Sequence, residues 1–152
     1  MGWLALALAV LVLPVVRAAE IGGRAEYVGG TVSAMEQHCS GTLVVSDDVT
    51  LLFRRPKQEL LRVPYERINL LEYGQKVNRR VAMAVLISPM FLLAKKRTHY
   101  LTVGYEDESG RQQALVFRVE KSDIRSVLVA LEARTGMKVQ YQDDEARKAG
   151  KG

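Results

Sequence analysis

The sequence predicts a mainly β domain that ends in one α-helix, and three observations support this. Apolar and polar residues alternate with period two around 49–53, 99–105 and 112–119. Gly, Pro, Asp and Ser clusters separate short apolar segments. A single helical stripe of apolar residues follows at 124–131. The 152 residues, 48% apolar and 26% charged, fit one globular domain and exclude a wholly disordered or polytopic membrane protein.

Seven strands are expected before the helix. Gly29 and Gly30 lie inside the first of them and predict a bulge or sharp bend. The Ser46-Asp47-Asp48 turn separates the second strand from the third, because Asp and Ser side chains bond to their own backbone. The expected strands cover 25–37, 42–45, 49–53, 60–63, 67–73, 99–105 and 112–119.

The C-terminal helix is expected to begin at Ser122 or Asp123, either of which can cap exposed N–H groups. Its apolar stripe consists of Ile124, Val127, Leu128 and Leu131. Gly136 suits the left-handed position that ends a helix. Residues 137–141 could form a short extension, and the polar residues 142–152 predict a flexible tail.

Two motifs resemble a pleckstrin-homology-like (PH-like) or GRAM-type domain. Gly41–Ser46 followed by Leu51-Leu52-Phe53 resembles the second and third strands of such domains. The second motif resembles an apolar, proline-containing corner of that family, with residues Val63–Ile68, Leu70, Leu71 and Glu72. The chain is also similar to small exported bacterial proteins. The resemblance places a PH-like domain over residues 25–141 and implies a seven-stranded bent sheet or partly open barrel capped by a helix.

The resemblance also implies binding rather than catalysis, usually of lipid headgroups or peptides. In that family a basic loop between the first two strands holds phosphoinositides. The corresponding residues here, 36–40, read Glu-Gln-His-Cys-Ser and contain no Lys or Arg. This departure argues against inositol phosphate recognition at the usual place.

Residues 1–18 are expected to form a secretory signal peptide. The fourteen-residue apolar run 3–16 would rise roughly 21 Å as a helix, short of the ~30 Å hydrocarbon core of a bilayer. Val16 and Ala18 offer small residues at the −3 and −1 positions of a cleavage site. The n-region has no charged side chain, so an uncleaved N-terminal anchor stays open. Either alternative predicts an exported protein, periplasmic or secreted, with possible membrane association.

An apolar insertion, residues 76–97, separates the fifth and sixth strands. Its middle, residues 81–94, has fourteen residues without a charge, and Ser88-Pro89 divides it into two short arms. Three interpretations stay open: the arms pack on the domain, they enter a membrane interface, or they bind another protein. The residues expected at a membrane or partner contact are Leu86, Ile87, Met90, Phe91 and Leu92 with the flanking cations Arg79, Arg80, Lys95, Lys96 and Arg97.

The sequence predicts no catalytic residue, cofactor or metal site. A single Cys excludes a cysteine-based zinc cluster, and two His residues leave little for a histidine metal site. The usual hydrolase, phosphate-loop and dinucleotide motifs are absent from the sequence. His38 and Cys39 are neighbours whose side chains should point apart on a strand, and the cations before His99 disfavour its protonated form. Cys39 is expected to be a small apolar side chain, with an intermolecular disulfide or a reactive thiol as alternatives.

The expected function is that of a non-enzymatic binding or scaffolding module of the cell envelope. The net charge of +5 suits an anionic membrane surface, and an envelope protein is the other expected partner. Nucleic acid is not expected, because no aromatic platform accompanies the cations. A self-associating structural protein, and so a homo-oligomer, stays open as an alternative. An envelope hydrolase is a further alternative, and it would require a pocket that joins His38 or His99 to an acid and a nucleophile.

Overall fold

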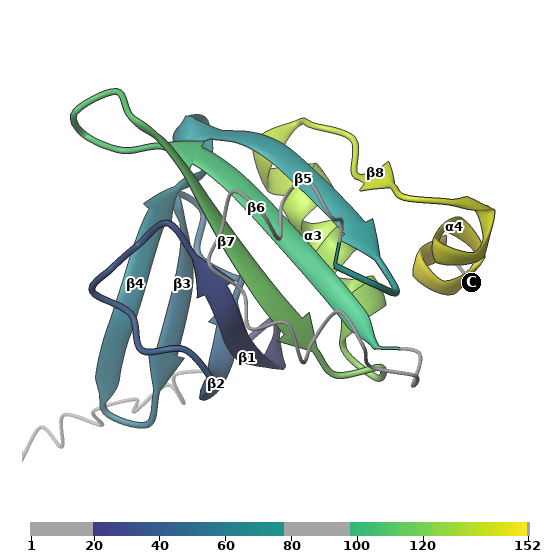
Figure 1. Ribbon diagram of the computed structural model, residues 1–152, viewed down its shortest axis with the longest axis horizontal. Coiled ribbons are helices and arrows are strands. Elements are labelled where there is room, and N and C mark those ends of the chain that lie inside the picture. The colour runs from purple at the N-terminus through teal and green to yellow at the C-terminus, as the bar shows by residue number, and fades with distance from the viewer. Residues whose placement is uncertain (1–19, 78–97, 152) are drawn as a thin grey trace, which may run out of the picture.

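The computed structural model describes residues 20–77 and 98–151, and these form one eight-stranded sheet with two helices after its seventh strand (Figure 1). The strand order is β4-β3-β2-β1-β7-β6-β5-β8. Neighbouring strands are antiparallel except β5 and β8, which are parallel. The bounds are β1 (Gly22–Gly30), β2 (Cys39–Val44), β3 (Thr50–Arg55), β4 (Gln58–Pro64), η1 (Tyr65–Arg67), β5 (Ile68–Gly74), β6 (His99–Glu106), β7 (Gln112–Val119), α3 (Ile124–Thr135), β8 (Gln140–Tyr141) and α4 (Asp144–Lys151).

The prediction of a mainly β fold with a C-terminal helix is confirmed, and the seven expected strands are present. The first strand is shorter than expected and ends at Gly30 rather than at residue 37. The pairing of β1 with β7 shifts register between Tyr27 and Gly29, which confirms the predicted bulge. Asp47 forms the predicted turn, because its Oδ1 accepts from the backbone N–H groups of Val49 (2.9 Å) and Thr50 (2.7 Å).

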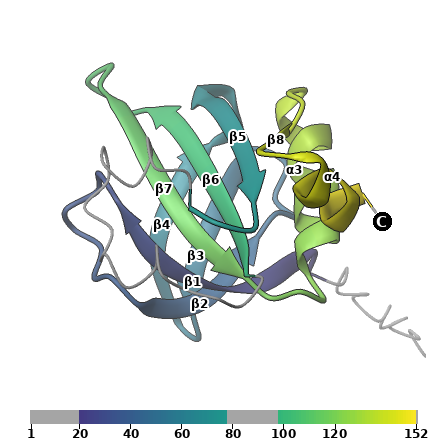
Figure 2. The ribbon, with the colours of Figure 1, turned by 45° about the vertical axis from the view of Figure 1, so that its right-hand side comes forward.

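The sheet is strongly curved, although it does not close. Phe53 on β3 and Phe117 on β7 are three strands apart in the sheet, which in a flat sheet would separate them by about 14 Å. Their ring centroids are only 5.1 Å apart. The two halves of the sheet therefore face each other across one core, and Figure 2 shows this curl.

Helix α3 packs against this core through the predicted stripe of Ile124, Val127, Leu128 and Leu131, all fully buried. Gly136 has φ +70° and its N–H donates to the Glu132 carbonyl, so the predicted helix end is confirmed. The predicted side-chain cap is wrong. Asp123 occupies the cap position, but its carboxylate accepts the backbone N–H of Arg24 on β1 (2.9 Å) and so ties the helix start to the sheet.

The C-terminal residues differ from the predicted flexible tail, because residues 140–151 form β8 and α4. Ala146 is fully buried, and Gly150 lies so close to Tyr141 that a Cβ atom there would be 2.6 Å from its Cε1. Small residues thus let α4 approach α3 and β5, and both views place it beside α3 (Figures 1 and 2). A polar sequence can form this helix because its contact surface needs only two small positions.

A second apolar cluster lies on the sheet face opposite α3. It contains the buried residues Val28, Val77, Tyr100 and Val116. Val28 and Val116 directly follow Tyr27 and Leu115, which belong to the main core. Val28 and Val116 are completely buried. The central strands therefore bury side chains on both faces, whereas the alternating pattern predicts one apolar face.

Candidate functional site

The contact residues predicted from the sequence lie outside the described part of the chain, as does the proposed leader, residues 1–18. They are Arg79, Arg80, Leu86, Ile87, Met90, Phe91, Leu92, Lys95, Lys96 and Arg97. The structure describes the two points where their segment joins the fold. Gly74 at the end of β5 pairs with Tyr100 near the start of β6, so the segment leaves and re-enters the fold at one end of the sheet. None of the described helices is long and apolar enough to cross a membrane.

A cavity of about 650 Å³ opens at the same end of the sheet. Five parts of the chain form it: the end of β5, the start of β6, the β7–α3 turn, the first turn of α3 and α4. Its size lies within the range of about 300–1,000 Å³ that is usual for small-molecule sites. The lining residues are Gln75, His99, Lys121, Ser122, Arg125 and Ala149.

His99 is the buried polar residue of this cavity, with 8% of its surface exposed. Its Nδ1 lies 2.5 Å from the Tyr73 hydroxyl, and the two rings stack at 11° with centroids 6.0 Å apart. Burial raises the pKa of Tyr73 to about 12, so its hydroxyl keeps its proton at neutral pH. That hydroxyl can donate to Nδ1, and in this tautomer the imidazole proton resides on Nε2 and makes His99 a hydrogen-bond donor at its other ring nitrogen.

Burial lowers the pKa of His99, and the positive charges of Lys121 and Arg125 lower it further. The imidazole is therefore neutral at pH 7. The cations that the sequence suggested, Lys95, Lys96 and Arg97 directly before His99, lie outside the described residues, and the largest cause of the lowered pKa is burial. The described cations that act on it come from the β7–α3 turn and the first turn of α3.

Lys121 and Arg125 are cations without carboxylate partners in the described chain. Six other arginines pair with Asp or Glu side chains, among them Arg118 with Glu26 and Arg134 with Asp48. Arg125 instead donates from Nε to the Ala149 carbonyl (3.2 Å), and its other N–H groups have no partner among the described residues. Lys121 and Arg125 thus bring two unpaired cations to the start of α3, where the helix dipole is also positive, although Glu120 and Asp123 lie beside them in sequence.

The described lining residues therefore offer hydrogen-bond donors and positive charge, and none of them is a carboxylate. Ser122 shares the cavity with His99, but its hydroxyl donates to Asp123 Oδ1 (2.6 Å) rather than to the imidazole. The cavity thus has the chemistry of a site that holds an anion. None of its residues was singled out by the sequence for this role. The available signal was Lys121 and Arg125 at a helix start, where acidic residues are usually preferred.

His38 lies outside this cavity, in a loop that precedes β2. It has φ +63°, and its Nδ1 lies 3.0 Å from Glu26 Oε1. Cys39 is buried in the main core, as expected for a small apolar side chain. Among the described residues, no group of three or more His, Cys, Asp and Glu side chains could hold a metal ion.

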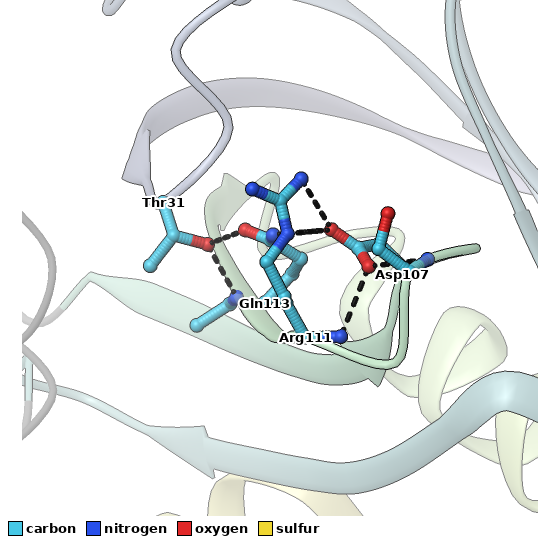
Figure 3. A network of polar contacts seen from close by, with 6 residues as sticks. Thr31, Asp107, Arg111 and Gln113 are labelled. Atoms are coloured by element: carbon cyan, nitrogen blue, oxygen red, sulfur yellow. Dashed lines mark hydrogen bonds and ion pairs between the residues drawn. The ribbon is translucent and has the colours of Figure 1, made fainter.

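The acidic loop between β6 and β7 is organised around Asp107 (Figure 3). Its Oδ1 accepts from the backbone N–H groups of Ser109 (2.8 Å) and Arg111 (3.0 Å), and its Oδ2 accepts from the side chains of Arg111 (3.0 Å) and Gln113 (2.8 Å). These bonds lower the pKa of the Asp107 carboxyl to about 2. Because both oxygens accept bonds within the loop, this carboxylate has a structural role.

A comparison with known families finds no model that matches the chain, and a comparison with curated proteins finds no match either.

Proposed function

We propose that this protein is a non-enzymatic, exported binding module of PH-like type that docks on an anionic membrane surface through residues 81–94. The run of seven antiparallel strands followed by α3 supports the PH-like assignment. The leader-like residues 1–18 support export.

The observation that carries the proposal is the position of the segment's two ends. Both lie at the sheet end where the cations Lys121 and Arg125 line the cavity, and the segment adds five flanking cations in sequence. Attraction to an anionic surface and burial of apolar side chains would then act at one end of the molecule. Each Leu, Ile or Phe transferred from water contributes roughly 1.5–3 kcal/mol.

Co-sedimentation with vesicles tests the proposal. The variant changes Leu86, Ile87, Phe91 and Leu92 to Ser. A matched control changes to Ser the three large apolar residues that are exposed elsewhere: Ile21, Val49 and Val129. We expect wild type and control to sediment with phosphatidylglycerol vesicles and less with phosphatidylcholine, and the segment variant to stay in solution. Equal sedimentation of a folded segment variant would refute membrane docking.

A second candidate is that residues 81–94 pack on the domain's own sheet. The apolar cluster of Val28, Val77, Tyr100 and Val116 favours it, because Val77 lies four residues before the segment and Tyr100 six after it. In this case the Ser variant loses stability, and vesicles bind neither protein. Self-association through the segment is the third outcome, and light scattering after size exclusion would show a dimer or larger species in the absence of lipid.

A further inference from the structure

The structure assigns a phosphate-binding site to the cavity formed by Gln75, His99, Lys121, Ser122, Arg125 and Ala149. This assignment concerns described residues alone and does not depend on membrane docking by residues 81–94. The ligand class is a phosphate ester, either free in solution or carried on a lipid headgroup.

The charge of the cavity supports an anionic ligand. Lys121, Arg125 and the buried ring of His99 line the same cavity, and both cations lower the pKa of the ring. Like charges placed near one another without partners repel, and an anion between them removes that repulsion. Within the described chain neither Lys121 nor Arg125 has a carboxylate partner, unlike Arg118 and Arg134, so both are available to bind an anion in the cavity that they line.

The donor set suits a tetrahedral oxyanion. In the tautomer whose Nδ1 accepts from the Tyr73 hydroxyl, His99 has an Nε2–H donor that makes no hydrogen bond within the described chain. The guanidinium of Arg125 supplies several N–H groups and Lys121 an ammonium group, while Gln75 adds an amide. Charge-assisted bonds of this kind are the strong ones in phosphate recognition. A neutral imidazole donor adds direction without adding a third charge.

The site is held in place before any ligand arrives. The Tyr73 hydroxyl orients His99, the Ala149 carbonyl orients Arg125, and Asp123 ties the β7–α3 turn to β1. Such positioning reduces the entropy that binding must overcome. The cavity volume of about 650 Å³ exceeds that of a phosphate group, so the phosphate would be part of a larger molecule.

Titration with inorganic phosphate at constant ionic strength tests the site, with the NMR signals of the His99 ring as the readout. The variant is Lys121→Gln/Arg125→Gln. The matched control is Lys138→Gln/Arg55→Gln, which removes the same amount of positive charge. Like Arg125, Arg55 donates from Nε to a backbone carbonyl at 3.2 Å. We expect saturable shifts of His99 in wild type and control, and affinity at least about tenfold weaker in the cavity variant. Unchanged melting temperatures show that each variant is folded.

Absence of saturable shifts in the wild type overturns the assignment, and so does an equal loss of affinity in both variants. Vesicles that carry phosphatidic acid, compared with glycerol 3-phosphate in solution, identify the source of the phosphate. Phosphate binding without vesicle binding upholds the site and refutes the membrane proposal. Vesicle binding without phosphate-dependent shifts refutes the site and leaves the membrane proposal standing.

Discussion

Phe117 is the residue whose removal tests the curved sheet most directly. It is completely buried on β7, and its ring meets Phe53 of β3 at 5.1 Å and Tyr27 of β1 at 5.8 Å between centroids. Truncation by Phe117→Ala therefore removes contacts that join the two halves of the sheet. A buried Phe→Ala change costs about 3–5 kcal/mol, a large part of the roughly 5–15 kcal/mol that stabilises a domain.

Urea unfolding followed by circular dichroism measures this loss, and a thermal scan should show a fall in melting temperature of roughly 10–20 °C. Val129→Ala is the control, because Val129 lies on α3 with 65% of its surface exposed. We expect it to change the unfolding free energy by less than about 0.5 kcal/mol. A loss below about 1 kcal/mol for Phe117→Ala would refute a single core shared by both halves of the sheet.

Three further predictions concern the ends of the sheet. The free energy of unfolding should fall as the pH drops below about 6.5, because the unfolded chain protonates the His99 ring near its ordinary pKa, whereas burial and nearby cations lower that pKa in the fold. Urea unfolding at a series of pH values should show a smaller fall for His99→Gln than for the wild type. An equal dependence on pH in the two proteins would contradict this. Asp107→Asn should speed hydrogen exchange of the backbone amides of Ser109 and Arg111, which donate to the Asp107 carboxylate. In the wild type these amides should stay protected down to a pH near the Asp107 pKa of about 2. Unchanged exchange in the variant would count against the Asp107 network. Gly150→Val should release α4 from the domain, because a Cβ atom there would lie 2.6 Å from Tyr141. We expect faster proteolysis within residues 144–151 but not within α3. Protection equal to that of the wild type would show that α4 tolerates the side chain.

The elements that the sequence predicts well are those with a strong local pattern. The alternation of Leu115, Phe117 and Val119 predicts a face that points to the core, and each of the three is buried as predicted, although Val116 is buried as well. Gly136 ends α3 because a left-handed residue without a Cβ is favoured there. In both cases the structure is determined by residues that are neighbours in sequence, so it can be predicted from the local sequence pattern.

Helix α4 was not predicted from the sequence, because its packing depends on small residues rather than on an apolar stripe. Ala146 and Gly150 give the helix its contact surface, and the aromatic rings that they meet belong to β5 and β8. The hydrogen bond that Asp123 makes also differs from the predicted one, for a similar reason. Its carboxylate accepts from Arg24, which is 99 residues away in sequence, instead of from its own helix. Neither contact has a local sequence signal.

The cavity shows why charge patterns are hard to interpret without a fold. Along the sequence, Lys121 and Arg125 look like solvated residues on a polar face. In the fold they stand at the start of α3 beside a buried imidazole, where the helix dipole and the desolvated ring both oppose extra positive charge. Six arginines elsewhere relieve their charge by pairing with carboxylates. Lys121 and Arg125 are exposed to solvent and have no carboxylate partner within the described chain, and a bound anion would supply the opposite charge. Because the anion would bind only the folded chain, its binding would also stabilise the contact between α3, α4 and the end of the sheet.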